Sequence, residues 1–297
     1  MKICILTQTA SDISDYYKFF FKGLDLFFVT FKEKNSKAID FLPSSTWSDG
    51  RNRLWDEVKG KYDYYLFIDD DLDFYKAKFT KFPLLQYIYQ QKIEKSIPRT
   101  FEKCSSDSFF RLLKKAVDSY KPEVLSVKNL SNLQNHFLDV LTVGKGSFVR
   151  RMGWFDAQFT LFSDYAANRL LPYDTTVSGW ASAQILIYLV AHHVFGSKSI
   201  SLNNLGVNNS FHSGAYVPDY KSNLDCKNMI AMICECANRD YRSLFDENSN
   251  HVNLFYGKDV IISHPIKGKG HEENYRANFS SSLTGLEKLM INNNLQF

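Results

Sequence analysis

The chain has 297 residues, 44% of them hydrophobic and 23% charged, which are values of a globular protein with a substantial core. Its net charge of +4, from 36 basic and 32 acidic residues, argues against nucleic acid as a main partner. Five cysteines follow no zinc-ligand spacing, so we expect buried, reduced thiols rather than a metal site or a disulfide framework.

The first 60 residues alternate predicted strands with predicted helices. Hydrophobic periodicity and capping signals give these elements in chain order: a strand over 2–7, a helix over 11–22 capped by Ser11 or Asp12, strands over 25–31 and 37–42, and a loop from 48 that runs into a helix reaching Val58. Such alternation is typical of a nucleotide-binding α/β domain with a mostly parallel central sheet flanked by helices.

An apolar run followed by a cluster of acids is the most informative pattern in the chain. Tyr64 to Ile68 reads as a strand buried on both faces, and Asp69, Asp70 and Asp71 follow it at once. Side chains alternate along an extended backbone, so we expect Asp69 and Asp71 to share one side. Such a pair repels unless a cation lies between its members, which favours Mg²⁺ or Mn²⁺ at the carboxyl end of the strand. An ordinary acidic loop is the alternative.

The remaining chain is predicted to continue with helices and strands. The expected helices cover 82–95, 105–120, part of 155–171, 180–195, 226–244 and 281–292. The expected strands cover 123–127, 140–143, 199–207 and 259–263. We place a main domain at 1–215, with halves that meet near residue 125, and a C-terminal extension, partly helical, at 216–297.

The N-terminal pattern resembles that of GT-A type glycosyltransferases, a nucleotide-sugar-dependent family with an Asp-x-Asp metal motif. Asp69-Asp70-Asp71 is similar to that motif in its residues and in its place after a strand. Gly50-Arg51-Asn52 is similar to the loop with which the family contacts nucleotide and phosphate. The resemblance covers residues 1–75 and implies Asp69 and Asp71 as metal ligands. It also implies a set of donor-binding residues: Thr7, Gln8, Thr9, Arg51, Asn52 and Asp70.

The segment from Asp174 to Gln184 resembles the place where the family carries a Gly-Trp pair before an acceptor-side helix. Many inverting members have an acidic general base just beyond that tryptophan, but here the matching positions are Ala183 and Gln184. Asp174 is therefore the first candidate for the base. Gln184 is a candidate for the amide that some retaining members place near the anomeric carbon, or an ordinary polar residue of a core helix.

A third metal ligand, often a late histidine, is usual in the family. His212 and His264 are the two candidates, and the second opens a glycine-interrupted basic loop that contains Lys267 and Lys269. By resemblance, these lysines would hold the diphosphate of the donor, because cations stabilise the charge of a leaving group. A solvated basic tail is the alternative for them.

The resemblance implies a transferase that uses Mn²⁺ or Mg²⁺ and passes a sugar to a glycan or lipid-linked acceptor in surface polysaccharide synthesis. The first apolar run is too short for a signal peptide, and 185–195 is too short to span a membrane. We therefore expect a cytoplasmic protein with peripheral membrane contact. The rivals are a non-catalytic carbohydrate-binding protein, a sugar-phosphate nucleotidyltransferase and an Asp-x-Asp phosphatase.

Overall fold

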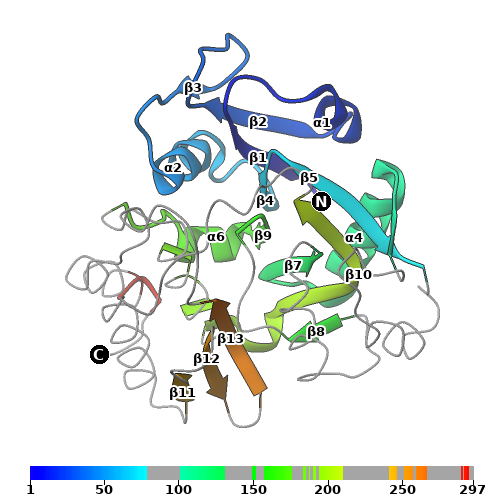
Figure 1. Ribbon diagram of the computed structural model, residues 1–297, viewed down its shortest axis with the longest axis vertical. Helices are drawn as coiled ribbons and strands as arrows, with labels where there is room; N and C mark the ends of the chain where they lie inside the picture. The colour runs from blue at the N-terminus through cyan, green and yellow to red at the C-terminus, as the bar shows by residue number, and fades with distance from the viewer. Residues whose placement is uncertain are drawn as a thin grey trace.

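A computed structural model describes the fold, and Figure 1 shows it as a ribbon. The described residues are 1–78, 101–130, 149–151, 157–175, 183–184, 187, 190–191, 194–209, 241–245, 251–256, 259–265, 289 and 291–293. The predictions for the helix at 82–95 and the strand at 140–143 lie outside these residues.

One edge of the main sheet is parallel, as the sequence predicts. Its strands are β1 (Ile3–Thr9), β2 (Asp25–Thr30), β3 (Asp40–Phe41) and β4 (Tyr64–Asp69). They lie in the order β3-β2-β1-β4, and every neighbouring pair among them is parallel. The carboxyl ends of β1 and β4 therefore meet at the same edge of the sheet, where Gln8 stands opposite Asp69.

The other part of the sheet is mostly antiparallel. Its strands are β9 (Phe159–Ser163), β7 (Val124–Asn129), β10 (Ser199–Asn209), β5 (Leu72–Ala77), β6 (Phe101–Lys103) and β8 (Val149–Arg151). β9 runs antiparallel to both β4 and β7, and β5 runs antiparallel to β10, whereas β7 and β10 are parallel. The α/β prediction is confirmed, but the sheet is mixed, whereas the sequence predicts a mostly parallel one.

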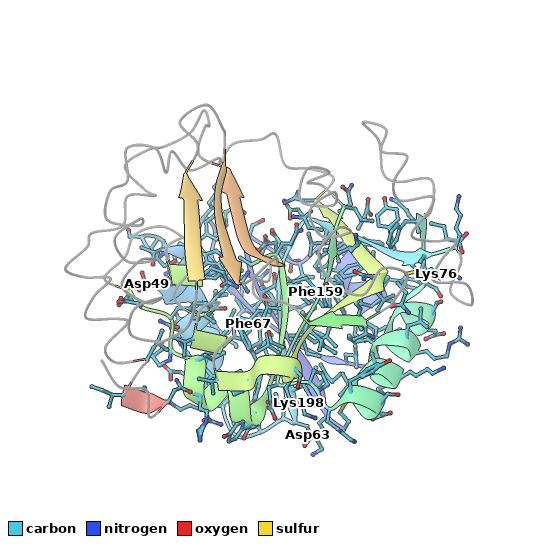
Figure 2. The ribbon with its side chains drawn as sticks, turned by 90° about the horizontal axis from the view of Figure 1, so that it is seen from below. Asp49, Asp63, Phe67, Lys76, Phe159 and Lys198 are labelled. Atoms are coloured by element: carbon cyan, nitrogen blue, oxygen red, sulfur yellow. The ribbon has the colours of Figure 1, made fainter. Side chains whose placement is uncertain are left out.

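Helices cover both faces of this sheet. On one face, α1 (Asp15–Phe20) and α4 (Ser106–Tyr120) share a buried apolar cluster with alternate residues of β4, Leu66 and Ile68. On the other face, α2 (Trp47–Val58) packs its Trp55 ring 4.8 Å from the ring of Tyr65. Figure 2 shows Phe67 and Phe159 in the interior, with Asp63 and Lys198 at the lower edge of that view.

The remaining elements are short. α6 (Asp164–Leu170) follows β9, and the 3-10 helix η1 (Gly196–Lys198) precedes β10. A separate three-stranded antiparallel sheet contains β11 (Tyr241–Phe245), β12 (His251–Tyr256) and β13 (Asp259–Pro265), in the lower part of Figure 1. Among the described residues, no helix is long and apolar enough to cross a membrane.

Several predicted elements need correction. α1 begins at Asp15 with Ser14 as its cap, so it is shorter than the predicted helix over 11–22. The predicted helix over 226–244 is wrong at its end, because β11 begins at Tyr241 and pairs with β12. The sequence reading also missed several strands: β5, β6, β8, β9, β11 and β12.

α2 begins earlier than predicted, and this changes the setting of Arg51 and Asn52. The Thr46 hydroxyl accepts a hydrogen bond from the Asp49 amide, while the Asp49 carboxylate accepts one from the Thr46 amide. This capping box satisfies two backbone donors at the start of the helix. Gly50, Arg51 and Asn52 therefore lie inside α2 rather than in a loop before it.

Candidate functional site

The three acids lie at the carboxyl end of β4 as predicted, but only Asp69 belongs to the strand. Asp70 and Asp71 form a turn, and Leu72 begins β5 directly after them. Asp69, Asp70 and Asp71 are called the acidic turn below, and all three are half-buried. Because the extended backbone ends at Asp69, alternation no longer supports the prediction that Asp69 and Asp71 share one side.

Arg51 binds the first acid of the turn. Its Nη2 donates to Oδ1 of Asp69 at 2.9 Å and to the carbonyl oxygen of Ala157 at 3.0 Å. The guanidinium lies 4.3 Å from the centre of the Trp47 ring and 5.5 Å from that of Phe67. Arg51 is only 2% exposed, and its Nε and Nη1 have no hydrogen-bond partner among the described residues. The site therefore contains a buried guanidinium with two nitrogens that can donate to a ligand.

Gln8, at the end of β1, is held next to α2. Its Nε2 donates to the carbonyl oxygen of Trp47 at 3.1 Å. A Cβ atom added at Gly50 would lie 1.6 Å from this same Nε2, so Gly50 gives Gln8 its room. Gln8 is thus placed between the first turn of α2 and the neighbouring strand β4, opposite Asp69 in the β1–β4 pairing.

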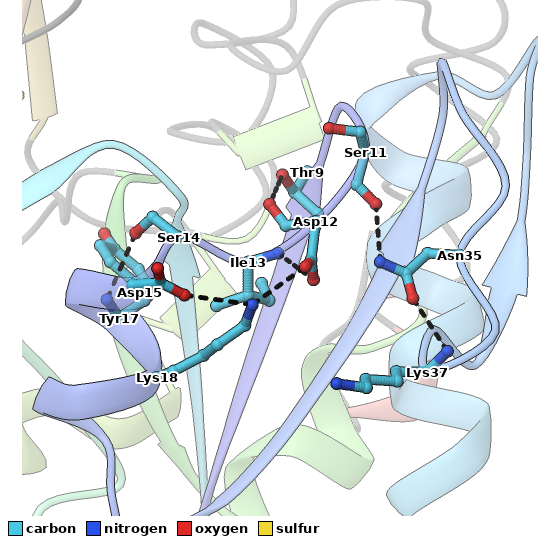
Figure 3. A network of polar contacts seen from close by, with 10 residues as sticks. All are labelled: Thr9, Ser11, Asp12, Ile13, Ser14, Asp15, Tyr17, Lys18, Asn35 and Lys37. Carbon is cyan, nitrogen blue, oxygen red and sulfur yellow. Dashed lines mark hydrogen bonds and ion pairs between the residues drawn. The ribbon is translucent and has the colours of Figure 1, made fainter.

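Thr9 lies near the second acid of the turn. Its hydroxyl donates to the carbonyl oxygen of Asp12 at 3.1 Å (Figure 3). Burial raises the pKa of Asp70, a hydrogen bond with Thr9 lowers it, and the neighbouring charge of Asp71 raises it. The net shift is upward, as expected for a carboxyl group that has lost much of its water. Thr7 lies deeper in β1 and is 1% exposed.

Asn52 ties α2 to the segment that carries Asp174. Its Nδ2 donates to the Tyr173 carbonyl oxygen at 2.8 Å, and its Oδ1 accepts from the Tyr173 amide at 2.7 Å. The Tyr173 ring lies 4.8 Å from that of Trp47, and burial raises the pKa of its hydroxyl well above the usual value. These contacts give Asn52 a structural role, and they bring Asp174 to the corner that contains Arg51.

The remaining predicted site residues are a buried glutamine, a histidine within a late strand, and three residues outside the described chain. Gln184 is fully buried in a helical segment. His264 lies within β13, opposite Val252, rather than after the end of that strand. His212, Lys267 and Lys269 lie outside the described residues. Their roles as metal and diphosphate ligands stay predictions.

Sequence reasoning missed polar residues that other strands bring to the same edge. Lys128, near the carboxyl end of β7, is 1% exposed, and β7 points the same way as β4 because both are antiparallel to β9. Asn209, at the end of β10, stands opposite Leu72, and Asn208 stands opposite Asp73. The sequence signal for these residues is the change from apolar to polar residues at the ends of β7 and β10, because ligands bind at the carboxyl ends of strands.

The donor atoms of the acidic turn fit a divalent cation in part. Carboxylate oxygens are the hard ligands that Mg²⁺ and Mn²⁺ prefer. Among the described residues, however, no group of three or more His, Cys, Asp or Glu side chains is placed to hold a metal ion. Mg²⁺ at phosphate sites needs only one or two carboxylates, since phosphate oxygens and water complete its shell. The turn therefore suits a cation that binds together with a diphosphate.

No protein-family model and no curated protein matches the sequence. Solved structures with some similarity include the mannosyltransferase PcManGT from Pyrobaculum calidifontis in complex with GDP-Man and Mn²⁺, at 10% identity and a TM-score of 0.47. That match covers 72% of this chain and 58% of that chain, so this chain spans less than two thirds of the mannosyltransferase.

A second similar structure is glucosyl-3-phosphoglycerate synthase from Mycobacterium tuberculosis with Mn²⁺, UDP-glucose and phosphoglyceric acid. It matches at 10% identity and a TM-score of 0.43, covering 89% of each chain. S. aureus TarS 1-349 matches at 10% identity and a TM-score of 0.41, covering 81% of this chain and 66% of that chain.

Proposed function

We propose that the chain is a metal-dependent glycosyltransferase that moves a sugar from a nucleoside diphosphate sugar to a glycan or lipid-linked acceptor. The observation that carries this proposal is the place of the acidic turn, which closes β4 beside the buried guanidinium of Arg51. β1 ends at the same edge of the sheet, where ligands of α/β proteins bind. Acids and a buried arginine at such an edge are the chemistry that a metal diphosphate needs.

Arg51 would serve the donor through its two unpartnered nitrogens. A buried donor without a partner costs free energy, so Nε and Nη1 favour a ligand oxygen that accepts from them. A diphosphate offers such oxygens, and a positive charge beside it would stabilise the leaving group. Gln8 and Thr9, at the end of β1, would contact the nucleoside. Thr7, Asn52 and Asp70 would support this part of the donor site.

Asp69 and Asp71 would hold the cation, with His212 or His264 as the third protein ligand. When bound, the cation would offset negative charge on the diphosphate as the sugar departs. Lys267 and Lys269 would add positive charge on the same group. Asp174 would take the proton of the acceptor hydroxyl, or Gln184 would contact the sugar from the acceptor side. We also propose, from the family resemblance, a role in surface polysaccharide synthesis in the cytoplasm at the membrane surface.

The phosphatase alternative is disfavoured by the position of its motif. It would use Asp71 and Asp73 as nucleophile and acid, but Asp73 lies inside β5 and pairs with Nζ of Lys103 at 2.9 Å. The nucleotidyltransferase alternative needs a glycine-rich basic loop after β1. The segment from Thr9 to Ser14 contains neither glycine nor lysine, and Asp12 there binds Lys18 of α1 (Figure 3).

Donor binding tests the proposal directly. We expect UDP, GDP or CMP, or one of their sugars, to raise the melting temperature only when Mn²⁺ is present. A panel of nucleotide sugars with a saccharide acceptor then tests transfer itself. Asp71→Asn should abolish Mn²⁺-dependent turnover at an unchanged melting temperature. Asp63→Asn, at the opposite end of β4 and exposed to solvent, is the matched control and should keep wild-type turnover.

The outcomes separate the alternatives. Binding of a sugar without any nucleotide-dependent chemistry would support the carbohydrate-binding protein instead. Release of pyrophosphate from a nucleoside triphosphate and a sugar phosphate would support the nucleotidyltransferase. Full turnover in Asp71→Asn, or no effect of any nucleotide with Mn²⁺, would contradict the proposed transferase.

A further inference from the structure

One tyrosine hydroxyl bridges the backbone across the acidic turn. Tyr17 of α1 donates from its hydroxyl to the carbonyl oxygen of Asp69 at 2.7 Å. The same hydroxyl accepts from the amide of Leu72 at 2.8 Å. Asp69 ends β4 and Leu72 begins β5, so a single oxygen atom joins the two ends of the turn. Nothing in the sequence pattern of Tyr17 distinguishes it from an ordinary core aromatic residue.

Tyr17 is itself held rigidly. Its side chain is 1% exposed, and its ring lies 5.3 Å from that of Phe21 and 6.1 Å from that of Phe74. Its amide donates to the hydroxyl of Ser14, the cap of α1, at 3.2 Å (Figure 3). With both its backbone and its ring fixed, the hydroxyl has a defined position, and so do the two backbone groups that it binds.

This hydroxyl is protonated at neutral pH, because a tyrosine loses its proton only at about pH 10. A protonated hydroxyl can donate and accept at once, which a phenolate cannot. The bridge therefore persists at neutral pH. Three consecutive carboxylates repel one another, and the two hydrogen bonds of the neutral hydroxyl help to hold the backbone of the turn against this repulsion.

We propose that Tyr17 is a positioning residue for the acidic turn, which it fixes before any ligand binds. This inference rests on the proposed function, because it assigns the turn to a cation and a diphosphate. A turn that is already ordered loses less conformational freedom when it binds a cation. Without the bridge, the carboxylates of Asp70 and Asp71 would have to be ordered during binding, and the affinity for the cation would fall.

Tyr17→Phe removes the hydroxyl and keeps the ring in the core. Tyr65→Phe is the matched control, because Tyr65 is 0% exposed and its hydroxyl also donates and accepts. It donates to Oδ1 of Asp164 at 2.9 Å and accepts from the Gly60 amide at 2.8 Å, away from the acidic turn. Both variants lose one buried hydroxyl with hydrogen bonds on each side, and only Tyr17→Phe changes the turn.

We expect Tyr17→Phe to bind Mn²⁺ with GDP or UDP about tenfold more weakly than wild-type protein, at a temperature where both are folded. Tyr65→Phe should keep the wild-type affinity, even if its melting temperature falls as much as that of Tyr17→Phe. Wild-type affinity in Tyr17→Phe, or an equal loss in both variants, overturns the inference. A wild-type protein that binds no Mn²⁺ with any nucleotide overturns the proposed function together with it.

Amide exchange supplies a readout that needs neither metal nor activity. In the metal-free wild-type protein, the Leu72 amide should exchange slowly, because it donates to a buried hydroxyl. In Tyr17→Phe this amide should exchange at least about tenfold faster, while amides in the middle of β4 keep their rates. If Tyr17→Phe does not fold, the wild-type measurement decides: an unprotected Leu72 amide overturns the inference, and a protected one supports it.

Discussion

Removing the carboxylate of Asp69 should destabilise the protein itself as well as the proposed metal site. The side chain of Arg51 is 3% exposed and that of Asp69 is 36% exposed, with 2.9 Å between Nη2 and Oδ1. Loss of one partner from a buried pair costs about 3–5 kcal/mol, because the other charge stays buried. Asp69 is partly hydrated, so water can reach the vacated space, and for Asp69→Ala we expect about 2–3 kcal/mol.

Urea unfolding at pH 7, followed by circular dichroism, measures this loss. The control is Asp40→Ala, which removes the 3.1 Å partner of Arg53, a more exposed arginine of the same helix. We expect it to cost less than about 1 kcal/mol, as surface ion pairs do. If Asp69→Ala costs no more than Asp40→Ala, then Arg51 does not depend on Asp69 and the reasoning is wrong.

A double variant tests the pairing itself. In Arg51→Met the charge is gone, while the flexible side chain can still pack against the rings of Trp47 and Phe67. Asp69→Ala added to Arg51→Met should therefore cost about 1–2 kcal/mol less than Asp69→Ala alone. Strictly additive losses would show that the two side chains act independently. This cycle also decides whether a loss of turnover in an Asp69 variant reflects chemistry or instability.

Three further predictions follow from contacts around the site. Asn52→Ala should lower the free energy of unfolding by about 2–3 kcal/mol in urea, since two backbone groups after α6 lose their partners. Gly50→Ala should cost about 1–3 kcal/mol by the same measurement, because the new Cβ displaces Gln8, and adding Gln8→Ala should recover part of that loss. The pKa of Asp12 is lowered, chiefly by its hydrogen bond from Lys18. The ionised carboxylate therefore stabilises the fold at a pH above the unfolded pKa, and this stabilisation is lost as the pH falls through the folded pKa. Asp12→Asn should accordingly lower the melting temperature at pH 7 and leave it unchanged at a pH below both pKa values.

Local patterns in the sequence predicted the elements with strong local signals. The strand that ends in the acidic turn was predicted because an apolar run stops abruptly at three acids, and β4 has those bounds to within one residue. The helix predicted over 105–120 is α4, which begins at Ser106 with Ser105 as its cap. β5 was missed although its residues alternate between buried and half-buried positions from Leu72 to Phe74. The three acids break the apolar pattern just before β5, which makes that strand hard to separate from the turn.

Pairings between distant residues were beyond the reach of sequence patterns. Arg51 and Asp69 meet because α2 lies across the face of β4 from which Phe67 projects, and no spacing in the chain encodes that crossing. Asn52 was assigned to nucleotide because its neighbours resemble a family loop. Its amide binds the backbone of Tyr173, 121 residues away. Such contacts depend on the packing of layers, which periodicity within one element does not determine.

The acidic turn is held from both faces of the sheet, and this has a consequence for its chemistry. Arg51 reaches the side chain of Asp69 from α2, while Tyr17 reaches its backbone from α1 on the opposite face. A site that two packed helices fix in advance needs little reorganisation when a charged ligand arrives. Core substitutions that shift α1 or α2 should therefore weaken donor binding even though they touch no ligand. On this reasoning, the aromatic cluster around Tyr17 would support the proposed donor site without contacting its ligand.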